Sequence, residues 1–354
     1  MQKPLALRRV QTPDLQADLA FEPELQAATP LRPAALARDA ADPLGWQLGQ
    51  DHARFHVTLP AAHLHPASPL FQGFHAALQS GASPRQREVA AGTRAWLALR
   101  LQAWTEGLPF EDQLLTPHYL RQLRRSHCPV TRAALHDELG HPQQRVWARL
   151  RQDLGYAAGH LVQLSQTAAK ALGGRSASAL SAQAERLNHE GGEFEGLDAA
   201  AWTRLAALVR LVTPHDAAAD ALPVLPPNRL RLLNPQQALQ AWIARQLALT
   251  GWAQRGTALH DALHGVPARQ AAHGLWAALA PHALALPQLD GVEQQWRLED
   301  VWRDARVQRR WSALLALLSG TDLEALLLKL PAPSGCHLEH HAESGATEGW
   351  TELH

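Results

Sequence analysis

Amphipathic helical spacing in the second half of the chain is the feature that most limits its possible folds. Apolar residues recur every three or four positions in five segments, at about residues 199–212, 235–249, 252–263, 268–281 and 292–318. This spacing gathers apolar side chains on one face of a helix. We therefore expect residues 199–330 to form an all-α domain and the whole chain to be mainly α-helical.

The first half of the chain divides into segments of different character. Residues 1–48 are rich in Pro and Ala and are expected to form a partly ordered arm. Residues 49–84 are expected to form a strand and loop segment, because residues 53–60 alternate apolar and polar side chains. Ser83 and Pro84 would start a helix that ends near Gly107, and a second helix is expected at about residues 117–125.

Two polar segments suggest further boundaries. Residues 173–198 contain two glycine-rich stretches and are expected to form a linker. Residues 331–354 carry four glutamates and neither Lys nor Arg, so they are expected to form a disordered acidic tail.

Composition removes several function classes. The 354 residues include 33 basic and 33 acidic side chains, so affinity for a polyanion has to come from local charge. We find neither a signal peptide nor an apolar run of membrane-spanning length, and we therefore expect a cytoplasmic protein without a membrane segment. Cys128 and Cys336 lie too far apart in sequence for a CxxC site. The excess of Ala, Leu and Arg is typical of a GC-rich bacterial genome.

One local pattern, within residues 118–172, points to a mechanism. Residues 130–140 and 141–154 are expected to form two short helices that meet at a turn on Gly140. The apolar residues that would face one another across this turn are Leu135, Leu139, Val146, Leu150 and Leu154. Residues 155–164 would then form a hairpin, and Ser165 would cap a closing helix that ends at Leu172.

This order of elements resembles a winged helix-turn-helix DNA-binding domain, which with its leading helix would cover residues 85–172. The resemblance implies that the second helix lies in the major groove of duplex DNA, with Gln and Arg side chains on base edges. The residues assigned to base contacts are Gln143, Gln144, Arg145, Arg149 and Gln152. Arg125, Thr131 and Arg132 are assigned to phosphates, and His160 to the wing. Residues 118–156 contain seven arginines and three acidic residues, and this excess would supply the affinity.

The resulting hypothesis is a non-enzymatic DNA-binding protein of the bacterial nucleoid. Its role would lie in transcription, replication or chromosome organisation, and the C-terminal helices would form a homodimer or sense a partner or effector. It implies neither a cofactor nor a metal.

Two alternatives stay open. The first is a helical scaffold or protein-interaction module. The second is a metal-dependent enzyme that uses the histidine pair His63 and His65, or the pair His260 and His264 one helical turn apart.

Overall fold

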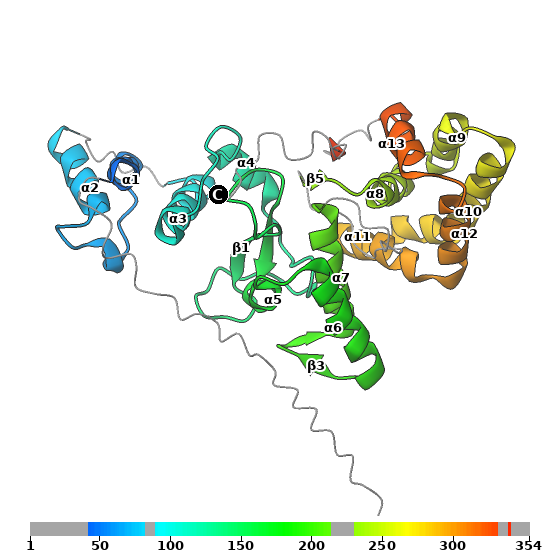
Figure 1. Ribbon diagram of the computed structural model, residues 1–354, viewed down its shortest axis with the longest axis horizontal. Coiled ribbons are helices and arrows are strands. Elements are labelled where there is room, and N and C mark those ends of the chain that lie inside the picture. The colour runs from blue at the N-terminus through cyan, green and yellow to red at the C-terminus, as the bar shows by residue number, and fades with distance from the viewer. Residues whose placement is uncertain (1–41, 82–88, 214–229, 332–338, 341–354) are drawn as a thin grey trace, which may run out of the picture.

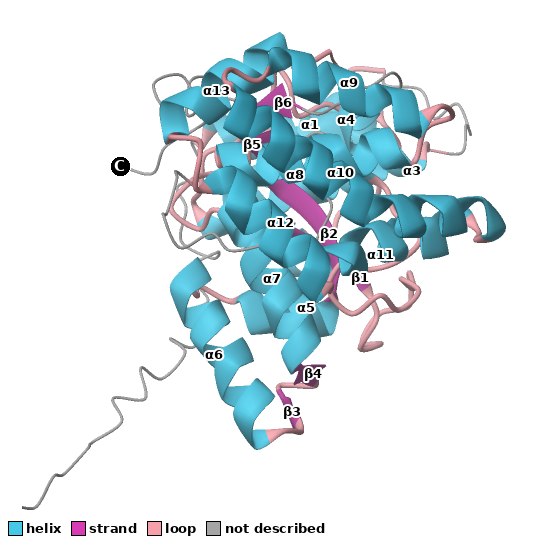
Figure 2. Cartoon of the chain, turned by 90° about the vertical axis from the view of Figure 1, so that its right-hand side faces the viewer, coloured by secondary structure: helices cyan, strands magenta, loops and turns pink. Residues whose placement is uncertain are grey.

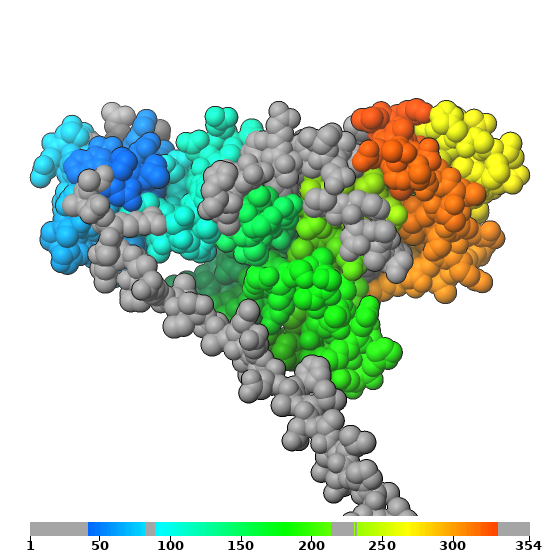
Figure 3. All heavy atoms as spheres, in the orientation of Figure 1, coloured from blue at the N-terminus to red at the C-terminus, as the bar shows by residue number. Residues whose placement is uncertain are grey.

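The chain folds into three neighbouring groups of helices around a small central β-hairpin (Figure 1). The computed structural model describes residues 42–81, 89–213, 230–331 and 339–340. In these residues helices dominate and all strands are short (Figure 2), so the expectation of a mainly α protein is confirmed. The three groups lie side by side in the space-filling view (Figure 3).

The N-terminal group contains the helices α1 (Pro43–Arg54), α2 (Pro69–Gln79) and α3 (Ala91–Glu106), with a 3-10 turn at Ala61–His63. Asp42 caps α1, and its carboxylate also accepts a hydrogen bond of 2.7 Å from the indole Nε1 of Trp104 on α3. The bond ties the first helix to the third. Gly107 ends α3 in a left-handed conformation, as expected.

Two sequence expectations for this group are wrong, and others lie outside the described residues. Residues 43–48 of the expected arm are helical, because Asp42 and Pro43 supply a helix start. The strand expected at residues 53–60 is absent, since α1 runs to Arg54 and a loop follows. Residues 1–41, Ser83 and Pro84 lie outside the described part of the chain.

The central group is built on an antiparallel pair of strands. It contains α4 (Pro117–Leu123), β1 (Arg145–Arg149), β2 (Leu161–Ser165) and α5 (Gln166–Leu172). Arg145 lies opposite Ser165, and Arg149 lies opposite Leu161. Ser165 caps α5, which confirms the expected closing helix.

The helix-turn-helix expected at residues 130–154 is wrong. Residues 130–144 form turns and isolated bridges, and the expected second helix contains β1 followed by a turn. Leu139, expected to pack between the two helices, is 87% exposed. All five residues of β2 are buried, and β1 supplies their backbone partner. This segment therefore contains no helix that could act as the recognition helix of a winged helix-turn-helix domain.

The expected linker is also structured. Residues 173–198 contain α6 (Ala177–Glu190) and the strands β3 (Glu193–Phe194) and β4 (Leu197–Asp198), and α7 (Ala199–Leu211) follows. Leu180, Ala184 and Leu187 of α6 join a hydrophobic core that includes Cys128 and Trp202. Buried residues from the described ranges 128–213 and 230–241 thus contribute to one continuous core.

The C-terminal group confirms most of the expected helices. It contains α8 (Pro235–Leu247), α9 (Trp252–Ala262), α10 (Val266–Ala285), α11 (Gly291–Asp300), α12 (Ala305–Leu315) and α13 (Gly320–Lys329). The helix expected at 292–318 is divided by a 3-10 turn at Val301–Arg303, after which Asp304 caps α12. Of the expected acidic tail, Glu339–His340 forms β6, which pairs in parallel with β5 (Arg231–Leu232).

Helix α8 connects two hydrophobic cores. Ala238 and Ala241 belong to the central core, whereas Leu239, Trp242 and Ile243 belong to the C-terminal core. The helix is therefore buried on nearly all sides.

A helix that crosses a membrane has to be long and continuously apolar. No single one of the described helices is long and apolar enough to cross a membrane. Taken together, α12 and α13 have the length and apolar composition of a membrane span, but the chain bends by 102° between them.

We predict that Gly49→Ala and Gly73→Ala each lower the stability of the protein. A Cβ atom on Gly49 would lie 2.0 Å from the carbonyl oxygen of Leu70, and one on Gly73 would lie 2.0 Å from that of Trp46. Helices α1 and α2 would have to separate, at a cost of about 1–3 kcal/mol. The measurement is urea denaturation. Gly291→Ala is the matched control, because its Cβ would meet no atom within 4 Å, and equal losses at all three positions would contradict the prediction.

Candidate functional site

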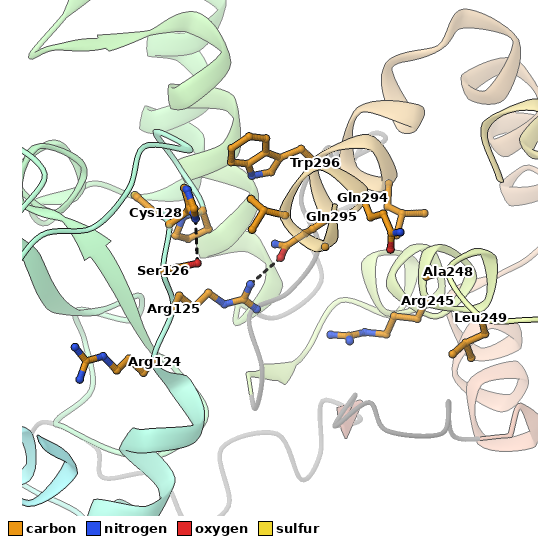
Figure 4. Close-up of a pocket in the computed structure, with 15 residues that line it drawn as sticks. Arg124, Arg125, Ser126, Cys128, Arg245, Ala248, Leu249, Gln294, Gln295 and Trp296 are labelled. Carbon is orange, nitrogen blue, oxygen red and sulfur yellow. Dashed lines mark hydrogen bonds between the residues drawn. The ribbon is translucent and has the colours of Figure 1, made fainter. Parts of the chain in front are cut away.

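A cleft of about 470 Å³ separates the central group from the C-terminal group (Figure 4). Residues 124–129, which follow α4, form one wall. The opposite wall is formed by residues of α11, namely Gly291, Val292, Gln294, Gln295, Trp296 and Leu298. Arg245, Ala248 and Leu249, at the end of α8, complete the lining. The cleft therefore draws on three segments that are far apart in the sequence.

The lining of this cleft is basic, and the described residues that form it include no carboxylate. Its titratable groups are Arg124, Arg125, Arg245, His127 and the thiol of Cys128. Arg124 forms an exposed ion pair of 3.1 Å with Asp137 outside the cleft. Arg125 has no ion pair with any described residue, and Figure 4 shows its guanidinium pointing toward that of Arg245. Burial lowers the pKa of Arg125; Glu299 opposes this shift, and Arg245 adds to it.

Arg125 is held in place by three neighbouring elements. Its backbone N–H donates to the side-chain oxygen of Gln163 on β2 (2.9 Å), and its carbonyl accepts from Arg145 on β1 (3.2 Å). Its guanidinium donates to Oε1 of Gln295 on α11 (3.0 Å). The side chain is thus positioned before any ligand arrives.

A charged network continues from Arg125 behind the cleft wall. Gln295 donates from Nε2 to Glu299 (3.2 Å), and Glu299 accepts a bond of 3.1 Å from Arg132. Arg132 also pairs with Asp300 at 2.7 Å. The side chain of Glu299 is only 1% exposed. Burial by itself lowers the pKa of Arg132, but the hydrogen bonds and charges of Asp300 and Glu299 outweigh it, so this pKa is raised.

An aromatic side chain stands at one end of the cleft. Trp296 on α11 is half-buried, and the ring of His127 meets it edge-on with centroids 5.6 Å apart. The guanidinium carbon of Arg132 lies 5.7 Å from its centroid. Ser126 Oγ and His127 Nδ1 are 3.0 Å apart. The arrangement offers a π surface beside positive charge.

Only Arg125 of the nine residues assigned to DNA contact from the sequence lines this cleft. Arg132 lies in the network behind it. Thr131 donates to Gln143 (3.1 Å), and Gln144 accepts from the backbone N–H of Gly140 (2.8 Å).

The other four assigned residues also make internal contacts. Arg145 pairs with Asp137, and Arg149 donates to the carbonyl of Leu154 and lies over the ring of Tyr156. Gln152 donates to the carbonyl of Arg149, and His160 is fully buried. These side chains stabilise the loops around β1 and form no common recognition face. The recognition helix expected to place Arg145, Arg149 and Gln152 in the major groove is absent, and His160, assigned from the sequence to the wing, is buried.

Sequence reasoning missed Arg245, Gln295 and Trp296. Each lies in a segment expected to be helical, and no local pattern distinguishes it from other helix residues. Only the contact between distant segments gives these side chains a shared position.

The histidine pairs do not form metal centres in the described part of the chain, where no group of three or more His, Cys, Asp or Glu could hold a metal ion. His63 is buried against Trp104, whereas His65 is exposed. His260 lies beside Asp261, and His264 beside Lys329.

We predict that Arg132→Gln destabilises the protein by about 3 kcal/mol or more. The change removes the ion pair between Arg132 and the buried carboxylate of Glu299, and breaking such a pair typically costs about 3–5 kcal/mol. The control is Arg124→Gln, which removes an exposed pair worth less than about 1 kcal/mol. Chemical denaturation measures both variants. A loss of less than about 1 kcal/mol for Arg132→Gln would contradict a structural role for the network.

We predict that His160 makes the fold sensitive to acid. Burial, with the nearby Arg149 and Arg151, lowers the pKa of His160 to about 3. The unfolded chain binds a proton near pH 6.5 and the folded chain does not, so stability is complete above pH 6.5 and falls as the pH decreases toward 3. This group contributes at most about 1.4 kcal/mol per pH unit. Urea denaturation between pH 7.5 and 4.5 should show a shallower slope for His160→Gln, and an unchanged slope would refute the assignment.

The chain was compared with protein-family models, with curated proteins and with solved structures. It matches none of them. The arginine-lined cleft therefore stands as the basis for inferring a function.

Proposed function

We propose that the protein binds single-stranded nucleic acid, with one phosphate between Arg125 and Arg245 and a neighbouring base against Trp296. The observation that carries this proposal is the approach of two guanidinium groups in a cleft in which no described lining residue is a carboxylate. This proposal replaces the expected partner, duplex DNA, with a single strand, and it moves the site from a helix on the surface to the cleft.

The electrostatics of the cleft favour an anionic ligand. Two like charges that face one another in a partly buried site are mutually unfavourable. Burial is the main cause of the lowered pKa of Arg125, and the charge of Arg245 adds to it. A phosphate bound between them would replace the repulsion with two attractions. Guanidinium groups also match phosphate oxygens in a bidentate geometry.

The shape and the aromatic wall favour a nucleotide over a bare anion. A volume of about 470 Å³ lies in the range of pockets that hold one small organic ligand. Proteins that bind single strands combine a positive groove with aromatic side chains on which bases stack. Trp296 supplies such a surface, and the amides of Gln294 and Gln295 lie in the same wall. An unpaired base can enter a cleft of this size, whereas a base inside a duplex cannot reach it without leaving the stack.

We predict that the double variant Arg125→Gln/Arg245→Gln binds a labelled single strand of 20 nucleotides at least about tenfold more weakly than the unchanged protein. Fluorescence anisotropy at about 50 and 200 mM salt measures the affinity. Two lost phosphate contacts should also lower the slope of log K against log salt by about 1.4. Trp296→Leu should weaken binding as well, without a change in that slope.

The matched control is Arg54→Gln/Arg186→Gln, which removes the same charge from two exposed sites on α1 and α6. Thermal denaturation of each variant shows whether it is folded. Equal affinity of the cleft and control variants would contradict the proposal, and so would a duplex that binds as tightly as the single strand.

A further inference from the structure

Helix α12 carries a second basic surface, separate from the cleft. Arg306, Arg309 and Arg310 are exposed and lie three and four residues apart, so they share one side of the helix. We call these three residues the α12 arginine face. Among the described residues none of the three forms an ion pair.

The acidic side chains nearest to this face in sequence are engaged elsewhere. Asp304 caps α12 by accepting from the backbone N–H groups of Arg306 and Val307, and it lies 3.8 Å from His282. Asp300 and Glu299 pair with Arg132. Positive charge therefore faces outward while the local negative charge is used within the fold.

The adjoining apolar side of α12 limits the kind of partner. Val307, Trp311 and Leu314 are almost completely buried in the C-terminal core. An amphipathic helix that binds a lipid bilayer inserts its apolar side into the membrane, and here that side is already covered by protein. The arginine face therefore has no apolar side free to insert into a bilayer and can hold a partner only through its charges.

We propose that the α12 arginine face is a second nucleic-acid contact, which binds the phosphates of a strand that extends beyond the cleft. This inference rests on the proposed function, because the strand enters through the cleft. Helix α11 forms a wall of the cleft and leads into α12 through the turn at Val301–Arg303. Figure 1 shows α11 between the central group and α12, so a strand that leaves the cleft has to pass α11 to reach α12.

Oligonucleotide length tests this arrangement. The variant Arg306→Gln/Arg309→Gln/Arg310→Gln should bind a labelled 20-nucleotide single strand about tenfold or more weakly than the unchanged protein. Its salt slope should fall by about 2, since three phosphate contacts are lost. Its affinity for a 6-nucleotide strand, measured by competition, should stay within about twofold. The cleft variant Arg125→Gln/Arg245→Gln should lose affinity for both lengths.

The matched control is Arg54→Gln/Lys170→Gln/Arg186→Gln, which removes three exposed positive charges from α1, α5 and α6. It should change the affinity for the 20-nucleotide strand by less than about twofold. Far-ultraviolet circular dichroism and thermal denaturation establish that each variant is folded.

The possible outcomes separate the two proposals. If the α12 variant and the control bind the 20-nucleotide strand alike while the cleft variant does not bind, the second contact is overturned and the proposed function stands. If the unchanged protein binds neither strand, both proposals fail. Sedimentation of the unchanged protein with vesicles of 30% phosphatidylserine and 70% phosphatidylcholine, lost in the α12 variant, would overturn the choice of partner.

Discussion

The buried carboxylate of Glu299 fixes the two walls of the arginine-lined cleft relative to one another. It lies on α11 in the C-terminal group, and it accepts hydrogen bonds from Arg132 in the central group and from Gln295, which in turn accepts from Arg125. A carboxylate that is 1% exposed is tolerable only with such partners. The position of Arg125 in the cleft therefore depends on a charge that a ligand would not touch.

A second buried charge reinforces the same junction. Arg204 on α7 is 6% exposed and donates from Nε to the carbonyl of Val130 at 2.6 Å. Burial, together with Arg132 and Arg303, lowers its pKa to about 10. The loop that carries Arg132 is thus fixed from both sides, by α7 through its backbone and by α11 through its side chain.

The sequence predicts the helices correctly where the spacing of apolar residues fits only a helix. It fails where the same spacing also fits a strand. Helices α7 to α10 follow a three-and-four spacing that no strand would show. Val146, Leu150 and Leu154 are each four residues apart, and an even spacing also places residues on one face of a strand. The choice between them depends on β2, which has five buried residues and needs a partner for its backbone. The backbone bond between Tyr156 and Pro109 (2.8 Å) is likewise invisible in either local segment.

The candidate site was less predictable than the fold. An arginine count identifies a basic segment, but it does not say which guanidinium groups are free to meet a ligand. Arg145 and Arg149 are used by Asp137, by carbonyl groups and by Tyr156. In the folded protein Arg125 lies beside Gln295 and Arg245, which are 170 and 120 residues away in the chain. Such a site exists only after the central and C-terminal groups pack together.

Helix α8 belongs to two hydrophobic cores, and this limits where the chain could be cut into parts that fold independently. Ala238 and Ala241 fill the core of the preceding helices, while Leu239, Trp242 and Ile243 fill the core of the following ones. A cut in the chain before α8 would take a wall away from the first core, and a cut after it would take one away from the second. Loss of either core exposes the same helix to water, so the two cores are expected to melt in one cooperative transition. The central and C-terminal groups thus have separate hydrophobic cores but are expected to unfold as a single unit.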